Sequence, residues 1–162
     1  MKMISRFLTM TWTYNGRCIT ELSDMPEGTF GFIYKITNGK TNQYYIGKKQ
    51  VVSIRKRKFG KREIAALEDK RMKKYEMVQK ESDWKTYFGS HPKIKELLTE
   101  CKNKNEWQVW EKRILEICKT KKELTYYECK FLFINEVLEN RSHQYINDNI
   151  LGKFYRKDFT EW

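Results

Sequence analysis

Residues 29–48 read TFGFIYKITNGKTNQYYIGK, and they predict more about the fold than any other part of the chain. In the first half, apolar and aromatic side chains recur at every second position, which is the period of a β-strand. Asn38 and Gly39 then break the run in a way typical of a tight turn, and a second β-rich stretch follows. We therefore predict an antiparallel hairpin with its loop near residues 38–42.

Further elements are predicted on both sides of this hairpin. Residues 1–28 end in the turn-like sequence Met-Pro-Glu-Gly, which suggests an N-terminal extension with a short hairpin. Residues 63–81 are rich in Ala, Leu, Lys, Glu and Met and contain no Gly or Pro, so we expect a helix there. We also expect a helix over residues 91–104, with Pro92 in its first turn, and a third strand over residues 107–118.

A capping box predicts the start of a later helix. Thr120 and Glu123 have the spacing in which each side chain caps the other residue's backbone N–H, and apolar side chains follow at intervals of three and four. Glu128 falls beside the apolar stripe and so points toward the core. A carboxylate in that position is costly unless it is paired or binds a metal, and both readings stay open.

Composition limits the class of protein. A chain of 162 residues with 40% hydrophobic residues can build one core, and the pattern of elements permits an α/β fold with a small three-stranded antiparallel sheet flanked by helices. The net charge of +12 indicates a densely negative partner, with nucleic acid as the first candidate. Apolar runs are too short for a spanning segment, which disfavours a membrane partner.

The most basic part of the chain is residues 48–74, with twelve bases against three acids. This stretch supplies the candidate nucleic-acid contacts, which are Lys48, Lys49, Arg57, Lys58, Lys61 and Arg62.

Cysteine and histidine usage disfavours zinc sites, disulfide frameworks and histidine-rich metal sites. The four cysteines are far apart and form no C-x-x-C pair, which disfavours zinc and a disulfide framework. Only two histidines are present, which disfavours a histidine-rich metal site. No secretory signal is evident at the N-terminus, so a cytoplasmic protein is expected.

The hairpin carries the sequences Gly-Phe-Ile-Tyr, ending at Tyr34, and Tyr-Ile-Gly, beginning at Tyr45. Arg55, Glu128 and Asn147 follow in order. This ordered set resembles the GIY-YIG nuclease family, in its phage-type homing or Seg-like branch, with a phenylalanine in place of the usual glycine of the first motif. The resemblance covers roughly residues 29–150.

The resemblance implies a metal-dependent DNA endonuclease that hydrolyses phosphodiester bonds. Glu128 would hold Mg²⁺ or Mn²⁺, and Tyr34 or Tyr45 would prepare the attacking water. Arg55 would grip the scissile phosphate, with Arg57 and Arg62 as the alternatives for this role. Asn147 would hold the pocket together. The alternatives for the last role are Asn149 and Asn140. Because Phe59 stands where many members carry His or Tyr, proton transfer would rest on the tyrosines, a water or His143.

The expected organisation is an extension over residues 1–28, a nuclease domain over 29–150 with a basic helical insertion at about 60–104, and a tail over 151–162. A homodimer is a further expectation, as is action in the host cytoplasm if the chain is phage-encoded. The alternative function is a non-catalytic nucleic-acid-binding or regulatory module on the same scaffold.

Overall fold

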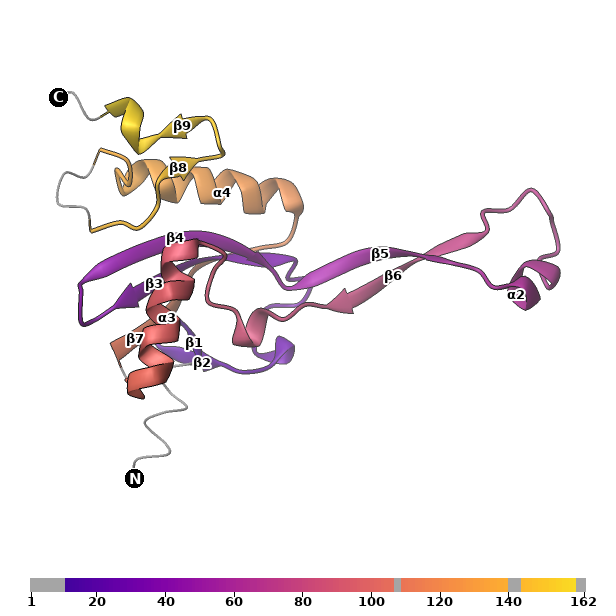
Figure 1. The fold of residues 1–162 in the computed structure, drawn as a ribbon. Coiled ribbons are helices and arrows are strands. Elements are labelled where there is room, and N and C mark those ends of the chain that lie inside the picture. Colours follow the sequence, from indigo (N-terminus) through magenta and orange to yellow (C-terminus); the bar gives the residue numbers. More distant parts are fainter. Residues whose placement is uncertain (1–10, 107–108, 140–143, 160–162) are drawn as a thin grey trace.

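The structure, a computed structural model, describes residues 11–106, 109–139 and 144–159. Its centre is a five-stranded sheet in the order β2-β1-β7-β3-β4 (Figure 1). The strands are β1 Trp12–Tyr14, β2 Arg17–Ile19, β3 Gly31–Asn38, β4 Gln43–Gln50 and β7 Trp110–Cys118. The predicted hairpin is confirmed, because β3 and β4 pair antiparallel without interruption. The predicted third strand is β7, which pairs antiparallel with β3.

The N-terminal hairpin of β1 and β2 is part of this sheet. β1 pairs parallel with β7 through Trp12 and Thr13, and Trp12 is buried against Phe32 with ring centroids 5.0 Å apart. The prediction of a three-stranded sheet is therefore wrong in strand number, since two short strands extend the antiparallel core. Strands of three residues carry too little periodicity for their partner to be recognised in the sequence.

A helix packs on each face of the sheet, so β3 is buried on both sides. These helices are α3, Pro92–Lys104, and α4, Lys121–Ile134, and both begin where the sequence predicted. Phe32 and Tyr34 lie in one core with Ile94 of α3, whereas Ile33 lies in a second core with Leu124 of α4. Successive side chains of a strand point to opposite faces, which explains the division.

Between β4 and α3, the chain forms a separate two-stranded sheet that projects from the body (Figure 1). We call residues 52–81 the arm. It consists of β5, Val52–Lys58, the short helix α2, Lys61–Ala65, and β6, Tyr75–Glu81. The helix predicted over residues 63–81 is therefore wrong beyond its first residues, and the basic insertion is a β-hairpin followed by α3. The composition favours a helix, but no apolar stripe with a 3.6-residue period supports one, so cross-strand pairs determine the conformation.

After α4, the chain returns along the outer edge of β4. Tyr44 N–H donates to Gln144 O at 2.6 Å, and Ile146 N–H donates to Tyr44 O at 2.7 Å. This segment covers a strand edge that would otherwise offer free backbone groups to another chain. The short strands β8, Asn149–Ile150, and β9, Phe154–Tyr155, follow above α4 (Figure 1). Within the described residues, no helix has the length and apolar character needed to cross a membrane.

Candidate active site

A surface cavity of about 260 Å³ lies where β4, α4, the start of α3 and the C-terminal segment meet. We call it the β4-edge pocket. Because it lies at the edge of the sheet, it receives side chains from both faces of β4. Tyr45 comes from the α3 face and Lys48 from the α4 face. The pocket is lined by Tyr45, Ile46, Lys48, His91, Glu128, Leu132, Asn147, Asp148, Asn149, Leu151 and Gly152.

Glu128 points from α4 into the pocket, on the core side that its place in the sequence indicated. Its carboxylate accepts from Lys48 Nζ at 2.8 Å, and only 17% of the Glu128 side chain is exposed. Thr125 Oγ1 lies 3.4 Å from the same ammonium group. The ion pair offsets the cost of holding a carboxylate away from bulk water. A negative and a positive group therefore stand side by side at the pocket wall.

Tyr34 lies behind the pocket rather than in its lining. Its side chain is 1% exposed, and its hydroxyl forms a hydrogen bond with Tyr87. Gly47 lies directly opposite on β4, and a Cβ there would come within 2.6 Å of the Tyr34 hydroxyl oxygen. The glycine of the Tyr-Ile-Gly motif is thus required by this close approach. Burial, followed by neighbouring phenols, raises the pKa of Tyr34 well above its ordinary value, so the hydroxyl keeps its proton.

Tyr45 is the tyrosine that reaches the pocket. Its ring centroid is 6.1 Å from that of Tyr34 and 5.8 Å from that of His91. Burial raises the pKa of Tyr45 to about 12, the phenol of Tyr87 and the carboxylates of Glu128 and Asp148 add to the rise, and a hydrogen bond with Ser90 opposes it. The phenol is therefore protonated at neutral pH, and its hydroxyl is placed to bind a water or a substrate oxygen.

His91 is a pocket residue that the sequence did not indicate. It caps the N-terminus of α3, where its Nδ1 accepts from Lys93 N–H at 3.2 Å. This bond places the ring proton on Nε2, which lies 3.3 Å from Asp148 Oδ2. In the sequence, the histidine before Pro92 indicates only the start of a helix, because nothing local shows that the fold brings it to Tyr45. The other histidine considered, His143, lies outside the described residues.

Asn147 attaches the C-terminal segment to β4 through two hydrogen bonds. Ile46 N–H donates to Asn147 Oδ1 at 3.0 Å, and Asn147 Nδ2 donates to Ile46 O at 2.8 Å. The residue is 6% exposed. Asn149, by contrast, accepts from Gly152 N–H in an exposed turn, and Asn140 lies outside the described residues. The geometry supports Asn147 as the asparagine that holds the pocket together.

The structure does not bring Arg55 to the other predicted catalytic residues. Arg55 is exposed on β5, opposite Val78, and does not line the β4-edge pocket. Lys49 lies near the base of the arm, where its ammonium group contacts Asp83 at 2.6 Å. Of the predicted nucleic-acid contacts, only Lys48 lines the pocket, and four others lie exposed on the arm: Arg57, Lys58, Lys61 and Arg62.

A pocket formed by a tyrosine hairpin, a helix carboxylate and an asparagine resembles the site expected of a GIY-YIG nuclease. The family model described as "Putative endonuclease segE, GIY-YIG domain" matches residues 12–150, including the hairpin of β1 and β2. The chain therefore belongs to the GIY-YIG nuclease family, in its Seg-like phage branch, and is an endonuclease that hydrolyses phosphodiester bonds. Comparisons with curated proteins and with solved structures gave no match.

Proposed function

We propose that this chain cuts DNA at the β4-edge pocket with one divalent metal ion held by Glu128. The observation that carries the proposal is the position of this carboxylate, 17% exposed and 2.8 Å from Lys48, in the same pocket as Tyr45. Nucleases of this family generally depend on a divalent metal. The net charge of +12 supports a polyanionic substrate.

The donor groups of the pocket fit Mg²⁺ or Mn²⁺ better than zinc. Within the described part of the chain, no group of three or more His, Cys, Asp and Glu could enclose a metal ion. A single carboxylate suits Mg²⁺, which keeps several waters and takes further ligands from substrate phosphates. When bound, the ion supplies positive charge that binds a phosphate oxygen and stabilises the leaving 3′ oxygen.

The protein's own groups position the reactants. Lys48 turns from Glu128 toward a phosphate oxygen, and Tyr45 orients the attacking water through its protonated hydroxyl. His91 carries its ring proton on Nε2 and donates it as a hydrogen bond to an oxygen at the pocket rim. Asn147 holds β4 in place through Ile46. Tyr34 supports Tyr45 from behind and does not contact substrate.

Arg55 acts from the arm in this proposal. Its guanidinium is a permanent cation suited to phosphate, and its exposed position on β5 supports a phosphate bound along the arm. Arg57 forms ion pairs with Glu63 and Glu76 at 2.8 and 2.5 Å, so it is less available for such a contact.

Family membership also supports a biological setting. A Seg-like phage endonuclease would act on DNA in the host cytoplasm, either in homing or in DNA degradation. Because one pocket cuts one strand at a time, a homodimer is the proposed form for double-strand cleavage.

The test is cleavage of supercoiled plasmid by the wild type, by Glu128→Gln and by the control Glu96→Gln, each with Mg²⁺ and with EDTA. Glu96 is an exposed carboxylate on α3 outside the pocket. We expect the wild type and Glu96→Gln to nick DNA only with Mg²⁺. Glu128→Gln should lose about 10²-fold or more, since even an indirect disturbance of a metal site costs 10–100-fold. If every protein shifts DNA in a gel but none cuts it, the chain is instead a non-catalytic nucleic-acid-binding module.

A further inference from the structure

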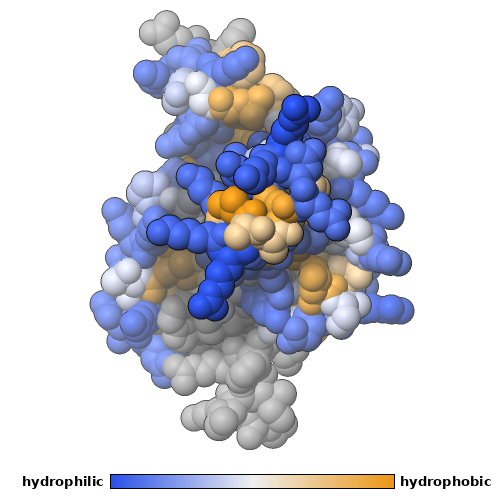
Figure 2. All heavy atoms as spheres, turned by 90° about the vertical axis from the view of Figure 1, so that its right-hand side faces the viewer, coloured by the Kyte–Doolittle hydropathy of each residue, from blue (hydrophilic) through white to orange (hydrophobic). Residues whose placement is uncertain are grey.

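The arm carries much charge and contributes little to the fold. It has eleven Lys and Arg against five Asp and Glu, and so holds half of the net charge of +12. Only Val52 of the arm belongs to either buried core. A lone two-stranded hairpin is only marginally stable in water, so its extension away from the body calls for a function. Figure 2 views the molecule from the side toward which the arm points and shows hydrophilic side chains around a small apolar patch.

The two faces of the arm differ in where their carboxylates lie. Residues that pair directly across an antiparallel ribbon lie on the same face, and the β5–β6 register therefore defines both faces. One face includes Glu76, which pairs with Arg57 at 2.5 Å. On the other face, Glu81 pairs with Val52 at the base of the arm and accepts from Trp84 Nε1 at 2.7 Å. The rest of that face has no carboxylate, and we call it the acid-free face. It consists of Ile54, Lys56, Lys58, Tyr75, Met77 and Gln79.

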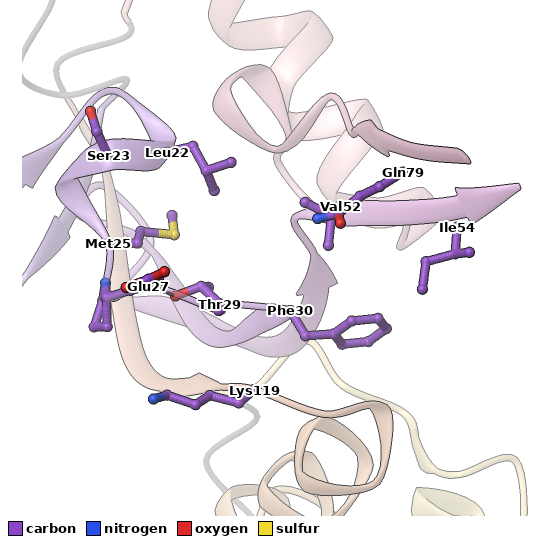
Figure 3. A pocket seen from close by; sticks show the side chains of 12 residues that line it. Leu22, Ser23, Met25, Glu27, Thr29, Phe30, Val52, Ile54, Gln79 and Lys119 are labelled. Carbon is purple, nitrogen blue, oxygen red and sulfur yellow. Dashed lines mark hydrogen bonds between the residues drawn. The ribbon is translucent and has the colours of Figure 1, made fainter. Parts of the chain in front are cut away.

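The acid-free face is exposed to solvent except at Tyr75, which is half-buried. Ile54 is 57% exposed and Met77 is 60% exposed, while Lys56 Nζ lies 3.7 Å from the centroid of the Tyr75 ring. At the base of the arm, Ile54 and Gln79 border an open cavity of about 760 Å³ (Figure 3). The body contributes Leu22, Met25 and Phe30 to the far side of this cavity. No part of the described body fills the space beside the arm's inner end.

The side chains of this face match the groups on the edges of base pairs. In the major groove, lysine donates to guanine, glutamine bonds both acceptor and donor of adenine, and apolar side chains contact the thymine methyl group. Two strands about 4.8 Å apart form a ribbon that the ~12 Å major groove admits. The minor groove, about 6 Å wide, is too narrow, and the major groove of A-form RNA is too deep and narrow for side chains to read.

We propose that the arm lies in the major groove of double-stranded DNA with its acid-free face toward the bases. The inference rests on the proposed DNA cleavage and adds the substrate class, B-form duplex. The acid-free face spans five residues per strand, which reach about 17 Å at ~3.3 Å per residue. At ~3.4 Å per base pair, this contact covers about five base pairs. The basic residues around α2 then lie at phosphates beyond the ribbon.

Shortening the arm tests the proposal without touching either core. Because Ile54 and Gln79 are directly opposite in the ribbon, residues 55–78 can be replaced by Asn-Gly, a two-residue hairpin turn. A second variant, Lys56→Gln/Lys58→Gln, keeps the whole arm and Arg55. Its matched control, Lys102→Gln/Lys104→Gln, removes the same charge from the exposed end of α3.

Binding to a duplex of about 30 base pairs is measured in EDTA by fluorescence anisotropy across a salt series. We expect the shortened arm to weaken binding about tenfold or more and to lower the salt slope by at least ~2, because each lost phosphate contact removes about 0.9. The Lys56/Lys58 variant should weaken binding and the control should not. Dimethyl sulfate should show guanine N7 protected over about five base pairs by the wild type, and this protection should vanish with the shortened arm.

Equal affinity of the wild type and the shortened arm would overturn the proposal, as would equal effects of the Lys56/Lys58 variant and its control. So would tighter binding of RNA duplex than of DNA duplex. The assay runs without catalysis, so these results are independent of the plasmid test. Binding that depends on the arm, without any nicking, would sustain this inference and refute the proposed cleavage alone.

Discussion

Replacing Asn147 with alanine tests how the β4-edge pocket is held together. The amide forms hydrogen bonds of 3.0 and 2.8 Å with the backbone of Ile46 and is almost fully buried. Its loss leaves one donor and one acceptor of β4 unpaired. At ~1–3 kcal/mol for each unpaired buried group, the free energy of unfolding should fall by about 2–6 kcal/mol. Because domains of this size have about 5–15 kcal/mol in total, the variant should still fold at low temperature.

The assay is urea unfolding followed by tryptophan fluorescence. Asn149→Ala is the matched control, since its side chain bonds only within an exposed turn, and we expect it to lose less than ~1 kcal/mol. Asn147→Asp is the second variant. It keeps an acceptor for Ile46 N–H but faces Ile46 O with a carboxylate oxygen, so it should lose at least as much stability as Asn147→Ala.

Nicking activity should fall with these Asn147 variants even at temperatures where they are folded, because Ile46 is flanked by Tyr45 and Gly47 on β4. Equal stability losses for Asn147→Ala and Asn149→Ala would refute the reasoning. A folded Asn147→Ala with full nicking activity would refute the link between this anchor and the pocket.

Two further predictions concern single hydroxyl and amine groups. Tyr45→Phe should reduce nicking by about 10²–10⁴-fold with little change in stability, whereas Tyr34→Phe should cost about 1 kcal/mol of unfolding free energy by losing its bond with Tyr87 and should retain most activity. The reverse pattern would exchange their roles. Lys112 is 1% exposed, and burial lowers its pKa to about 7 from 10.5. The unfolded chain therefore binds the proton more tightly between these pH values, and stability should rise with pH across this window. Lys112→Met should be more stable than the wild type at pH 7 by up to about 4 kcal/mol and should lose this part of the pH dependence. Parallel stability curves for the two proteins from pH 7 to 10 would contradict the prediction.

Local sequence signals predicted the parts of the fold that local physics determines. The hairpin at residues 29–48 has a clear period and turn, and α4 has a capping box in which Thr120 and Glu123 bond reciprocally as expected. Pro92 in the first turn of α3 is a local signal of the same kind, and it marks the start of that helix. The parallel pairing of β1 with β7 depends on contacts between distant residues, and three-residue strands give no sign of it.

The arm shows how one wrong conformation changes several functional predictions at once. A helix over residues 63–81 would be compact, but the observed ribbon carries Arg55, Arg57 and Lys58 away from the β4-edge pocket. The family resemblance indicated Arg55 as a catalytic group from its position after Tyr45. Spacing along the chain, however, implies proximity in space only when the conformation between the two residues is known. Tyr45, Glu128 and Asn147 meet in the pocket because they lie on, or are bonded to, elements that the sequence predicted correctly.

The pocket depends as much on the C-terminal segment as on the tyrosine hairpin. Arg156 Nη2 donates to the carbonyls of Val137, Tyr145 and Asn147 at 2.8, 2.8 and 2.7 Å. One guanidinium thus joins the turn after α4 to the segment that covers β4, so the wall bearing Glu128 and the wall bearing Asn147 are held by the same group. The spacing between Glu128 and Tyr45 is therefore set by contacts outside the motif residues, which explains why the motif alone does not define the site.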